Sequence, residues 1–302
     1  MIKQGSVQLD SYRLAQYSVQ VPCYICEGGN SFDAELCRHC FAPMALAHQA
    51  NSQKIAPRMI AAIGASGVGK TVYLGMLMDI LSRQSDRLQM LARGAFSITL
   101  QQVTASALAR NEFPNKTPNE PDRWNWVHSQ VRSPSHRRPV DLIMPDLAGE
   151  ALLEEIDHPH TYPVIRSLLS KCAGVLMLVD TVKLQSGIHD QDYFAMKLLT
   201  YLIELDNHPK HGWSQRPVGL VFSKADECEE CFDDPVAYAK AHSAGLWQHC
   251  HEQFKRFQFF AAGVAGGCAY RNLPEGRVRV PLRIEPRGIV EPFEWLVDQL
   301  KE

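Results

Sequence analysis

Eight consecutive residues of this chain form a loop whose side chains and spacing suit it to bind phosphate. They match the pattern G-x-x-x-x-G-K-T: Gly64, Ala65, Ser66, Gly67, Val68, Gly69, Lys70 and Thr71. The glycines let successive backbone N–H groups face phosphate oxygens at the positive end of the following helix. Lys70 would place its charge on the β- and γ-phosphates, and the Thr71 hydroxyl would bind Mg²⁺. The apolar run 59–63 before the loop and the helix-forming stretch after it disfavour the alternative of a glycine turn without a ligand.

A second pattern, D-x-x-G, follows an apolar run further along the chain. Residues 140–145 have the composition of a strand, and Asp146, Gly149 and Glu150 come directly after them. Asp146 would hold the Mg²⁺ shell, and the Gly149 N–H would reach the γ-phosphate. The pattern is common by itself, but its place after a strand downstream of a phosphate loop gives it weight.

Ser223-Lys224-Ala225-Asp226 follows the apolar run 218–222 and resembles the N/T-K-x-D element with which P-loop GTPases recognise guanine. A carboxylate at Asp226 accepts from both N1–H and the N2 amino group of guanine, whereas adenine offers neither donor and would leave it unpaired. The Lys224 stem would lie over the base. A last element, in which a backbone N–H meets guanine O6, is expected after the next strand, and we place it at Ala262.

The first switch segment of a P-loop GTPase contains a threonine that closes over Mg²⁺. This threonine comes shortly before the second strand in the sequence. Thr117 precedes a predicted hairpin, 124–131 with 140–145, by a short irregular stretch. Thr99 and Thr104 are the alternatives, but they fall in periodic segments. We therefore predict Thr117 as the third Mg²⁺ ligand, beside Thr71 and Asp146.

Four cysteines form two C-x₂-C pairs separated by ten residues: Cys23, Cys26, Cys37 and Cys40. Four thiolates can hold one tetrahedral Zn²⁺ and leave no position for a catalytic water, so the spacing predicts a structural zinc ribbon. A segment this short cannot bury enough core, so the metal would supply its folding energy. Cys228 and Cys231 lack a matching pair at zinc-site spacing and do not predict a second zinc site.

These motifs require an α/β domain that holds them at one sheet edge. Apolar runs of strand length alternate with helical stretches from residue 58 onward, which predicts a mostly parallel central sheet flanked by helices. The predicted strands are 59–63, 124–131, 140–145, 174–179, 218–222 and 257–261. Helices should begin near Lys70, Gln102, Gly149, Asp190 and Pro235, with a last one at 291–300. Residues 1–50 would form an N-terminal extension with the ribbon, 51–54 a linker, and 58–302 the P-loop domain.

Composition excludes several classes of protein. The formal net charge is −2 and the cysteine count of nine is odd, with no export signal, which favours the reducing cytoplasm. Residues 1–57 carry four basic and four acidic side chains, and this balance disfavours nucleic-acid binding. No apolar run is long enough to span a bilayer. The partners that we expect for this chain are a protein that binds the ribbon, a second GTPase or another copy of the chain itself.

The order of the four nucleotide motifs resembles the TRAFAC-class P-loop GTPases. Asp146–Glu150, the Phe-Pro-x-Lys-Thr-Pro stretch 113–118 and the tail 284–296 are similar to the bacterial double-GTPase families of conflict and defence gene clusters. The resemblance covers about residues 58–302 and implies a Mg²⁺-dependent GTPase switch with GTP/GDP as ligand. Ser223 and Ala262 depart from the guanine-recognition motifs.

Glu150 stands where Ras-like enzymes have the glutamine that orients water. An ionised Glu150 accepts a hydrogen bond but cannot donate one, and it lies near phosphate oxygens of like charge. We expect slow turnover by the isolated chain, with Lys70, Thr117 and Glu150 as catalytic residues. Glu150 would either swing away from the γ-phosphate or be redirected by a partner towards an arginine, such as Arg166 or one from another chain. A nucleotide-dependent interaction module with negligible hydrolysis and a P-loop ATPase are the alternatives.

Overall fold

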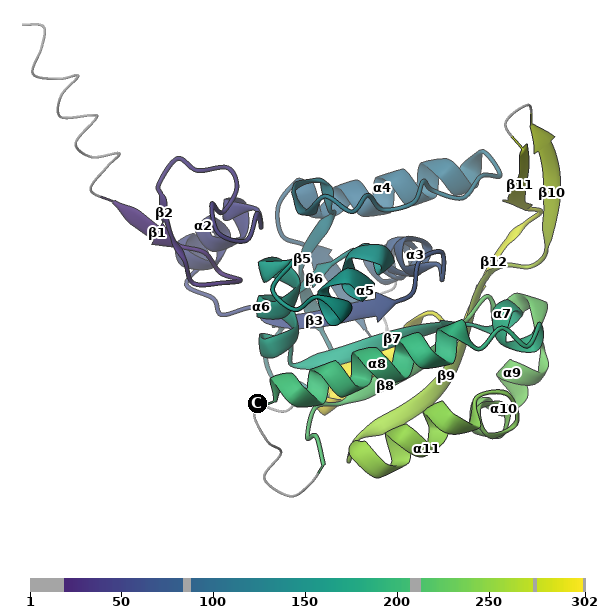
Figure 1. Cartoon of the computed structure of the whole chain (residues 1–302). Coiled ribbons are helices and arrows are strands. Elements are labelled where there is room, and N and C mark those ends of the chain that lie inside the picture. Colours follow the sequence, from purple (N-terminus) through teal and green to yellow (C-terminus); the bar gives the residue numbers. More distant parts are fainter. Residues whose placement is uncertain (1–18, 84–87, 207–212, 274–275, 301–302) are drawn as a thin grey trace, which may run out of the picture.

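The computed structural model describes residues 19–83, 88–206, 213–273 and 276–300. Its centre is an eight-stranded sheet with the order β12-β9-β8-β7-β3-β6-β5-β4 (Figure 1). Five neighbouring strands, from β9 to β6, are parallel, whereas β5 and β4 on one side and β12 on the other are antiparallel to their neighbours. The predicted α/β fold with a mostly parallel sheet is therefore confirmed. The strands are β3 (Arg58–Gly64), β4 (Gln89–Ala92), β5 (Trp126–Arg132), β6 (Val140–Pro145), β7 (Gly174–Asp180), β8 (Val218–Ser223), β9 (Phe257–Ala265) and β12 (Ile284–Arg287).

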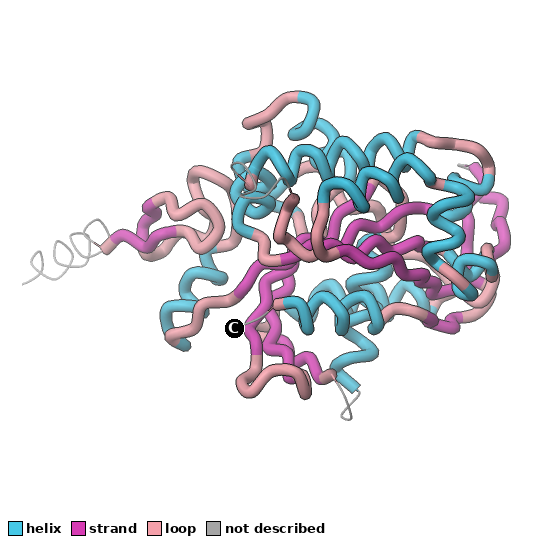
Figure 2. Tube along the Cα trace, turned by 90° about the horizontal axis from the view of Figure 1, so that it is seen from below, coloured by secondary structure: helices cyan, strands magenta, loops and turns pink. Residues whose placement is uncertain are grey.

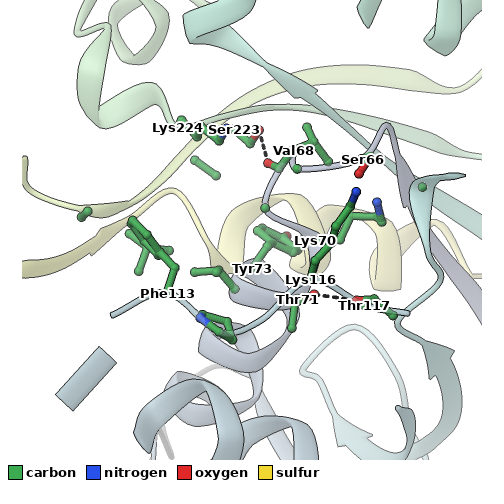
Figure 3. A pocket seen from close by; sticks show the side chains of 18 of the residues that line it. Ser66, Val68, Lys70, Thr71, Tyr73, Phe113, Lys116, Thr117, Ser223 and Lys224 are labelled. Atoms are coloured by element: carbon green, nitrogen blue, oxygen red, sulfur yellow. Dashed lines mark hydrogen bonds between the residues drawn. The ribbon is translucent and has the colours of Figure 1, made fainter. Parts of the chain in front are cut away.

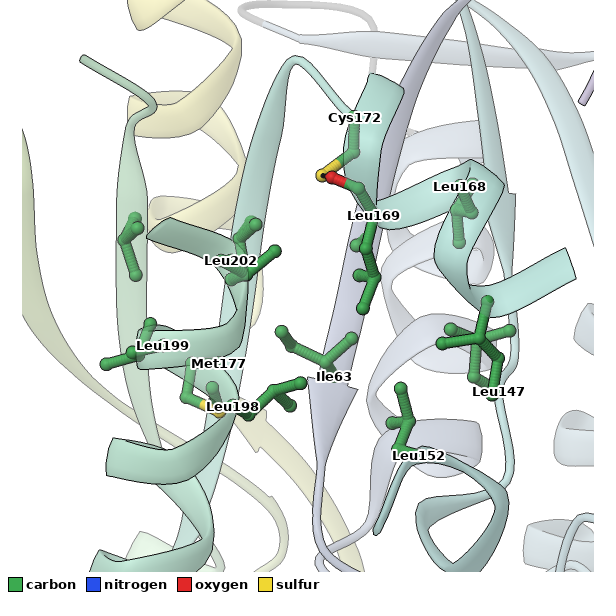
Figure 4. Packing of buried hydrophobic residues seen from close by; sticks show 14 of the residues in the cluster. Ile63, Leu147, Leu152, Leu168, Leu169, Cys172, Met177, Leu198, Leu199 and Leu202 are labelled. Carbon is green, nitrogen blue, oxygen red and sulfur yellow. Dashed lines mark hydrogen bonds between the residues drawn. The ribbon is translucent and has the colours of Figure 1, made fainter. Parts of the chain in front are cut away.

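The central strands are mostly apolar because helices cover both faces of the sheet (Figure 2). Ile60 and Ala62 of β3 pack with α3 (Lys70–Arg83), α4 (Phe96–Ala109) and α12 (Val290–Gln299). Ile63 points to the other face, where it packs among Leu147, Leu152 and Leu198 (Figure 4). The helices of that face are α5 (Gly149–Asp157), α6 (Pro163–Lys171), α8 (Asp190–Leu205), α10 (Pro235–His242) and α11 (Ala244–Gln253).

The four-cysteine segment forms a small unit beside α6. It contains β1 (Gln20–Pro22), β2 (Gly29–Ser31) and α2 (Met44–Gln53). Lys171 at the end of α6 donates to the Ile25 carbonyl at 3.0 Å and to the Glu27 carboxylate at 2.6 Å, and the Tyr24 hydroxyl donates to the Pro57 carbonyl at 2.5 Å. Figure 1 shows this unit at the end of the molecule opposite the hairpin of β10 (Cys268–Leu273) and β11 (Gly276–Pro281).

Several predicted boundaries are wrong. The predicted linker 51–54 is not extended, because α2 continues to Gln53 and ends at Lys54 in the left-handed conformation. The helix predicted near Gln102 begins earlier, at Phe96, and the strand predicted from Trp124 begins at Trp126, after the 3₁₀ turn η1 (Pro121–Arg123). The sequence reasoning missed β4, α6, α11 and the β10–β11 hairpin. No helix within the described residues is long and apolar enough to span a membrane.

Candidate functional site

The predicted nucleotide-binding motifs meet around one cavity of about 340 Å³ at the carboxyl ends of the parallel strands. The loop after β3, the stretch 113–119, the start of α5, the end of β8 and the end of β9 all line it. The predicted residues that line the cavity are Ser66, Gly67, Val68, Gly69, Lys70, Thr71, Thr117, Gly149, Glu150, Ser223, Lys224, Asp226 and Ala262. Gly64, Ala65 and Asp146 contact these residues.

The phosphate loop joins β3 to α3 and depends on glycine for its backbone conformation. Gly67 and Gly69 have φ values of 74° and 97°, which side-chain-bearing residues rarely adopt. Apart from their adjacent residues, no described residue has an atom within 4 Å of a Cβ built on either of them, so conformation rather than lack of space requires glycine there.

Lys70 is buried and donates to the carbonyl oxygens of Gly64 at 2.8 Å and Ala65 at 3.0 Å. Burial disfavours the ammonium form and lowers the pKa of Lys70 to about 8. The side chain therefore lies along the inside of the phosphate loop, where an anionic ligand would favour its charged form.

Three oxygen-bearing side chains from separate segments converge beside the loop. The Thr71 and Thr117 hydroxyls each lie 2.9 Å from Asp146 Oδ2 and 3.0 Å from each other. Asp146 is buried, which raises its pKa, and its Oδ1 has no hydrogen-bond partner among the described residues. Hydroxyl and carboxylate oxygens are the donors that Mg²⁺ prefers, so the donor set fits that ion. Thr99 and Thr104, the alternatives to Thr117, lie in α4.

The start of α5 approaches the phosphate loop at Gly149. A Cβ built on Gly149 would lie 2.4 Å from the Ser66 nitrogen and 2.5 Å from the Ala65 carbonyl carbon. Because both atoms belong to the backbone, only glycine permits this approach.

Glu150, the next residue, forms an ion pair with Lys116, which lowers the pKa of the carboxyl group. The suggestion that Arg166 holds Glu150 is wrong, because Arg166 lies near the Tyr201 hydroxyl, at 3.5 Å.

The end of β8 is tied to the phosphate loop and to β7. The Ser223 hydroxyl lies 2.8 Å from the Val68 carbonyl oxygen and 3.1 Å from that of Val179 (Figure 3). Lys224 is left-handed, with a φ of 58°, and its ammonium group donates to Asp180 Oδ2 at 2.5 Å. Asp180 also caps the short helix α7 (Thr181–Gln185). The sequence analysis assigned no role to Asp180; its position at the end of the buried strand β7 was the signal.

Asp226 lies where β9 and the β10–β11 hairpin approach the cavity. Burial raises the pKa of its carboxyl group. A Cβ built on Gly263 would lie 2.8 Å from the backbone nitrogen of Asp226, so the close approach of β9 requires glycine there. Ala262 pairs with Ser223 across the two strands.

The hairpin adds two cavity residues that no motif indicated, Cys268 and Arg279. Arg279 forms an ion pair with Glu227, the residue after Asp226.

The four predicted zinc ligands are brought together. The ligand sulfurs of Cys23, Cys26, Cys37 and Cys40 lie within 4.8 Å of one another. The Cys23–Cys40 and Cys26–Cys37 sulfur distances are 3.7 and 3.5 Å. A tetrahedron with zinc–sulfur bonds of 2.3 Å has edges of about 3.8 Å, so the geometry fits zinc. Backbone N–H groups also point at two of the sulfurs, from Ile25 to Cys23 and from His39 to Cys37.

Within the described part of the chain, Cys228 and Cys231 belong to no such cluster of three or more metal-binding side chains. The Cys228 sulfur instead accepts from the Gln185 amide at 2.8 Å.

One protein-family model matches the chain. It is Double-GTPase 1 (DO-GTPase1), and the match covers residues 61–197, from β3 through the phosphate loop, the Thr117 segment and Glu150 into α8. No curated protein matches the chain. The match supports a GTP-binding GTPase, and the predicted guanine-recognition element around Asp226 lies beyond the matched residues.

Proposed function

We propose that this protein is a Mg²⁺-dependent GTPase that acts as a molecular switch. The observation that carries the proposal is the convergence of Thr71, Thr117 and Asp146 beside the phosphate loop, because this arrangement suits a metal-bound triphosphate. The double-GTPase match over these residues supports the same function.

In GTP hydrolysis, a water oxygen bonds to the γ-phosphorus while the bond from that phosphorus to the β–γ bridging oxygen breaks. The electron pair of the broken bond stays on GDP, and the water proton ends on inorganic phosphate. Lys70 and the loop N–H groups from Ser66 to Thr71 would neutralise the charge on the transferring group. The two threonine hydroxyls and Asp146 would hold Mg²⁺, which supplies further positive charge to the phosphate oxygens when bound.

Guanine rather than adenine is the proposed base. Asp226 is partly buried and lines the cavity, and burial disfavours its ionised form, so that form gains from additional hydrogen-bond donors. Guanine satisfies both carboxylate oxygens with N1–H and N2–H, whereas adenine satisfies neither. Ala262 would present its backbone N–H to O6, and the Lys224 stem would lie against the base.

The zinc ribbon is proposed to dock a protein partner close to the first switch. Leu36 and Phe41 of the ribbon, both partly exposed, line a groove together with residues 119–122 and Tyr162. Residues 119–122 follow Thr117 directly, so a partner in this groove would contact the segment that binds Mg²⁺. We propose that the protein is cytoplasmic and acts in a bacterial conflict or defence system. The partner that it binds would be another protein, a second GTPase or another copy of this chain.

The deciding experiment identifies the nucleotide that co-purifies with the protein, by mass spectrometry after denaturation. Guanine nucleotide is expected; adenine nucleotide would favour the P-loop ATPase alternative. Phosphate release from GTP over hours then separates a GTPase from an interaction module that hydrolyses little. We propose an intrinsic rate below about 10⁻² per second, roughly that of unassisted Ras, because no arginine from a partner is supplied.

Lys70→Ala provides the matching binding test. This variant should lose tight binding of fluorescent GTP while its fold is kept, because Lys70 is the lysine of the phosphate loop. Unchanged affinity would contradict the proposed phosphate site.

A further inference from the structure

The two segments that would surround the γ-phosphate are joined by one ion pair, between Lys116 and Glu150. Lys116 precedes Thr117 in the first switch segment, and Glu150 begins α5 after Gly149. The two side chains are 59% and 48% exposed. An ion pair this exposed contributes little to stability, so exchanging one of its partners costs little.

The Lys116 side chain lines the cavity as well as being partly exposed to solvent. Figure 3 shows its side chain beside Lys70 and Thr71, and it lines the same cavity as the phosphate loop. Two lysines therefore present positive charge to the place that a γ-phosphate would occupy.

Glu150 by itself is a poor substitute for the glutamine of other GTPases. A glutamine amide accepts a hydrogen bond from water through its oxygen and donates one through its nitrogen, whereas an ionised carboxylate only accepts. The Lys116 ammonium group has three donors and no acceptor. Together, Lys116 and Glu150 have both capacities of one glutamine side chain.

We propose that Lys116 is a catalytic residue that donates to a γ-phosphate oxygen of GTP while it keeps Glu150 beside the attacking water. This inference rests on the proposed GTPase function and names how the switch segments perform it. Lys116 supplies in the same chain a positive charge that other GTPases receive from an arginine of a partner. Its neighbour Thr117 beside Asp146 sets where the ammonium group lies, so the lysine is positioned when the first switch closes.

The test compares wild type with Lys116→Met in single-turnover GTP hydrolysis and in the binding of GDP and a non-hydrolysable GTP analogue. Lys116→Met removes a hydrogen-bond donor to the phosphate oxygens on which negative charge develops in the transition state, so hydrolysis should slow by about 100-fold. Affinity for the analogue should fall and affinity for GDP should not, because only the analogue has a γ-phosphate. Lys197→Met is the matched control: Lys197 pairs with Asp157, the two side chains are 53% and 40% exposed, and the pair lies outside the cavity.

The double variant Lys116→Met with Glu150→Gln separates a chemical role from a structural one. A glutamine at position 150 restores the missing donor, so the double variant should hydrolyse GTP at least about tenfold faster than Lys116→Met alone. No recovery, or an equal loss of GDP and analogue affinity in Lys116→Met, would overturn the inference in favour of a positioning role.

Two further outcomes distinguish this inference from the function on which it rests. Lys116→Met that hydrolyses GTP at the wild-type rate would overturn the inference and leave the GTPase standing. Wild-type protein that binds GTP and releases no phosphate would overturn both.

Discussion

Replacing Ser223 with alanine removes the hydroxyl that joins the end of β8 to the phosphate loop. Ser223 lies 2.8 Å from the Val68 carbonyl oxygen and is buried, as is Val68 itself. The same hydroxyl lies 3.1 Å from the Val179 carbonyl oxygen of β7. The substitution therefore deletes a contact between the base-recognition element and the phosphate loop without adding bulk.

The size of the effect follows from what remains after the hydroxyl is gone. A lost hydrogen bond lowers the free energy of unfolding by about 1 kcal/mol, and by up to about 3 kcal/mol if the Val68 carbonyl stays buried without a partner. If the phosphate loop instead moves so that the Val68 carbonyl bonds to water, nucleotide binding must return the loop to its original conformation at a cost in free energy. That part of the loss then weakens affinity, by about fivefold for 1 kcal/mol and about 150-fold for 3 kcal/mol.

Urea unfolding of the nucleotide-free protein and titration with fluorescent GDP measure the two parts separately. Ser129→Ala is the control, because the Ser129 hydroxyl is equally buried and has no hydrogen-bond partner among the described residues. Its removal should leave GDP affinity unchanged and should not lower the free energy of unfolding, because no hydrogen bond is lost. If Ser223→Ala matched this control in both measurements, the Ser223–Val68 contact would have no role in positioning the loop.

Three further predictions concern the zinc ligands and the base. Elemental analysis should return about one zinc per chain, because the described residues contain one four-sulfur cluster. Cys37→Ser should lower this zinc content. Two zinc equivalents per chain would mean that Cys228 and Cys231 also bind metal. Asp226→Asn should weaken GTP binding and improve XTP binding in competition assays, because an amide donates to the xanthine C2 oxygen that a carboxylate repels; an undiminished preference for GTP would contradict guanine recognition by Asp226. GTP affinity should fall as the pH drops through the pKa of Asp226, which burial raises above its ordinary value, because the ionised form accepts from guanine and the protonated form does so poorly. Affinity measured from neutral to mildly acidic pH should show this loss in wild type, and a loss of the same size in Asp226→Asn would assign it to another group.

The sequence was sufficient for the parts of the fold that local pattern determines. The phosphate loop could be predicted because its glycines, lysine and threonine lie in eight consecutive residues. The strands β7 and β8 could be predicted because strands covered on both faces are continuous apolar runs. One long-range contact could also be predicted from the order of the motifs along the chain. The stretch before the hairpin contains few threonines that could reach the metal site, which pointed to Thr117.

The β10–β11 hairpin escaped prediction because its strands are mostly exposed. Arginines alternate along β11, at Arg277 and Arg279, and the strand has no continuous apolar run. Nothing in its local composition indicates that it pairs with β10 and brings Arg279 and Cys268 to the cavity. These contacts depend on where β9 ends, and the predicted strand stopped four residues before its actual end at Ala265.

The partner of Glu150 was mispredicted for a different reason. Arg166 lies closer in sequence to Glu150 than Lys116 does, but α6 packs so that Arg166 lies near Tyr201 of α8. The Lys116–Glu150 pair forms because Thr117 lies next to Asp146 and brings the preceding lysine to the start of α5. Such a contact is set by two loops that meet at a sheet edge, and residue spacing alone does not encode it.

The contacts around the cavity differ in strength from one end to the other. At the base end, Ser223 contacts the Val68 and Val179 carbonyls and Lys224 pairs with buried Asp180, so the carboxyl ends of β7 and β8 are held to the phosphate loop. At the phosphate end, the exposed Lys116–Glu150 pair joins the two segments, and it can exchange partners at little cost. GTP and GDP share the base and differ in the γ-phosphate. In the proposed GTPase, the nucleotide difference would therefore act on the segment that carries Lys116 and Thr117, and this segment continues into residues 119–122 beside the four-cysteine unit.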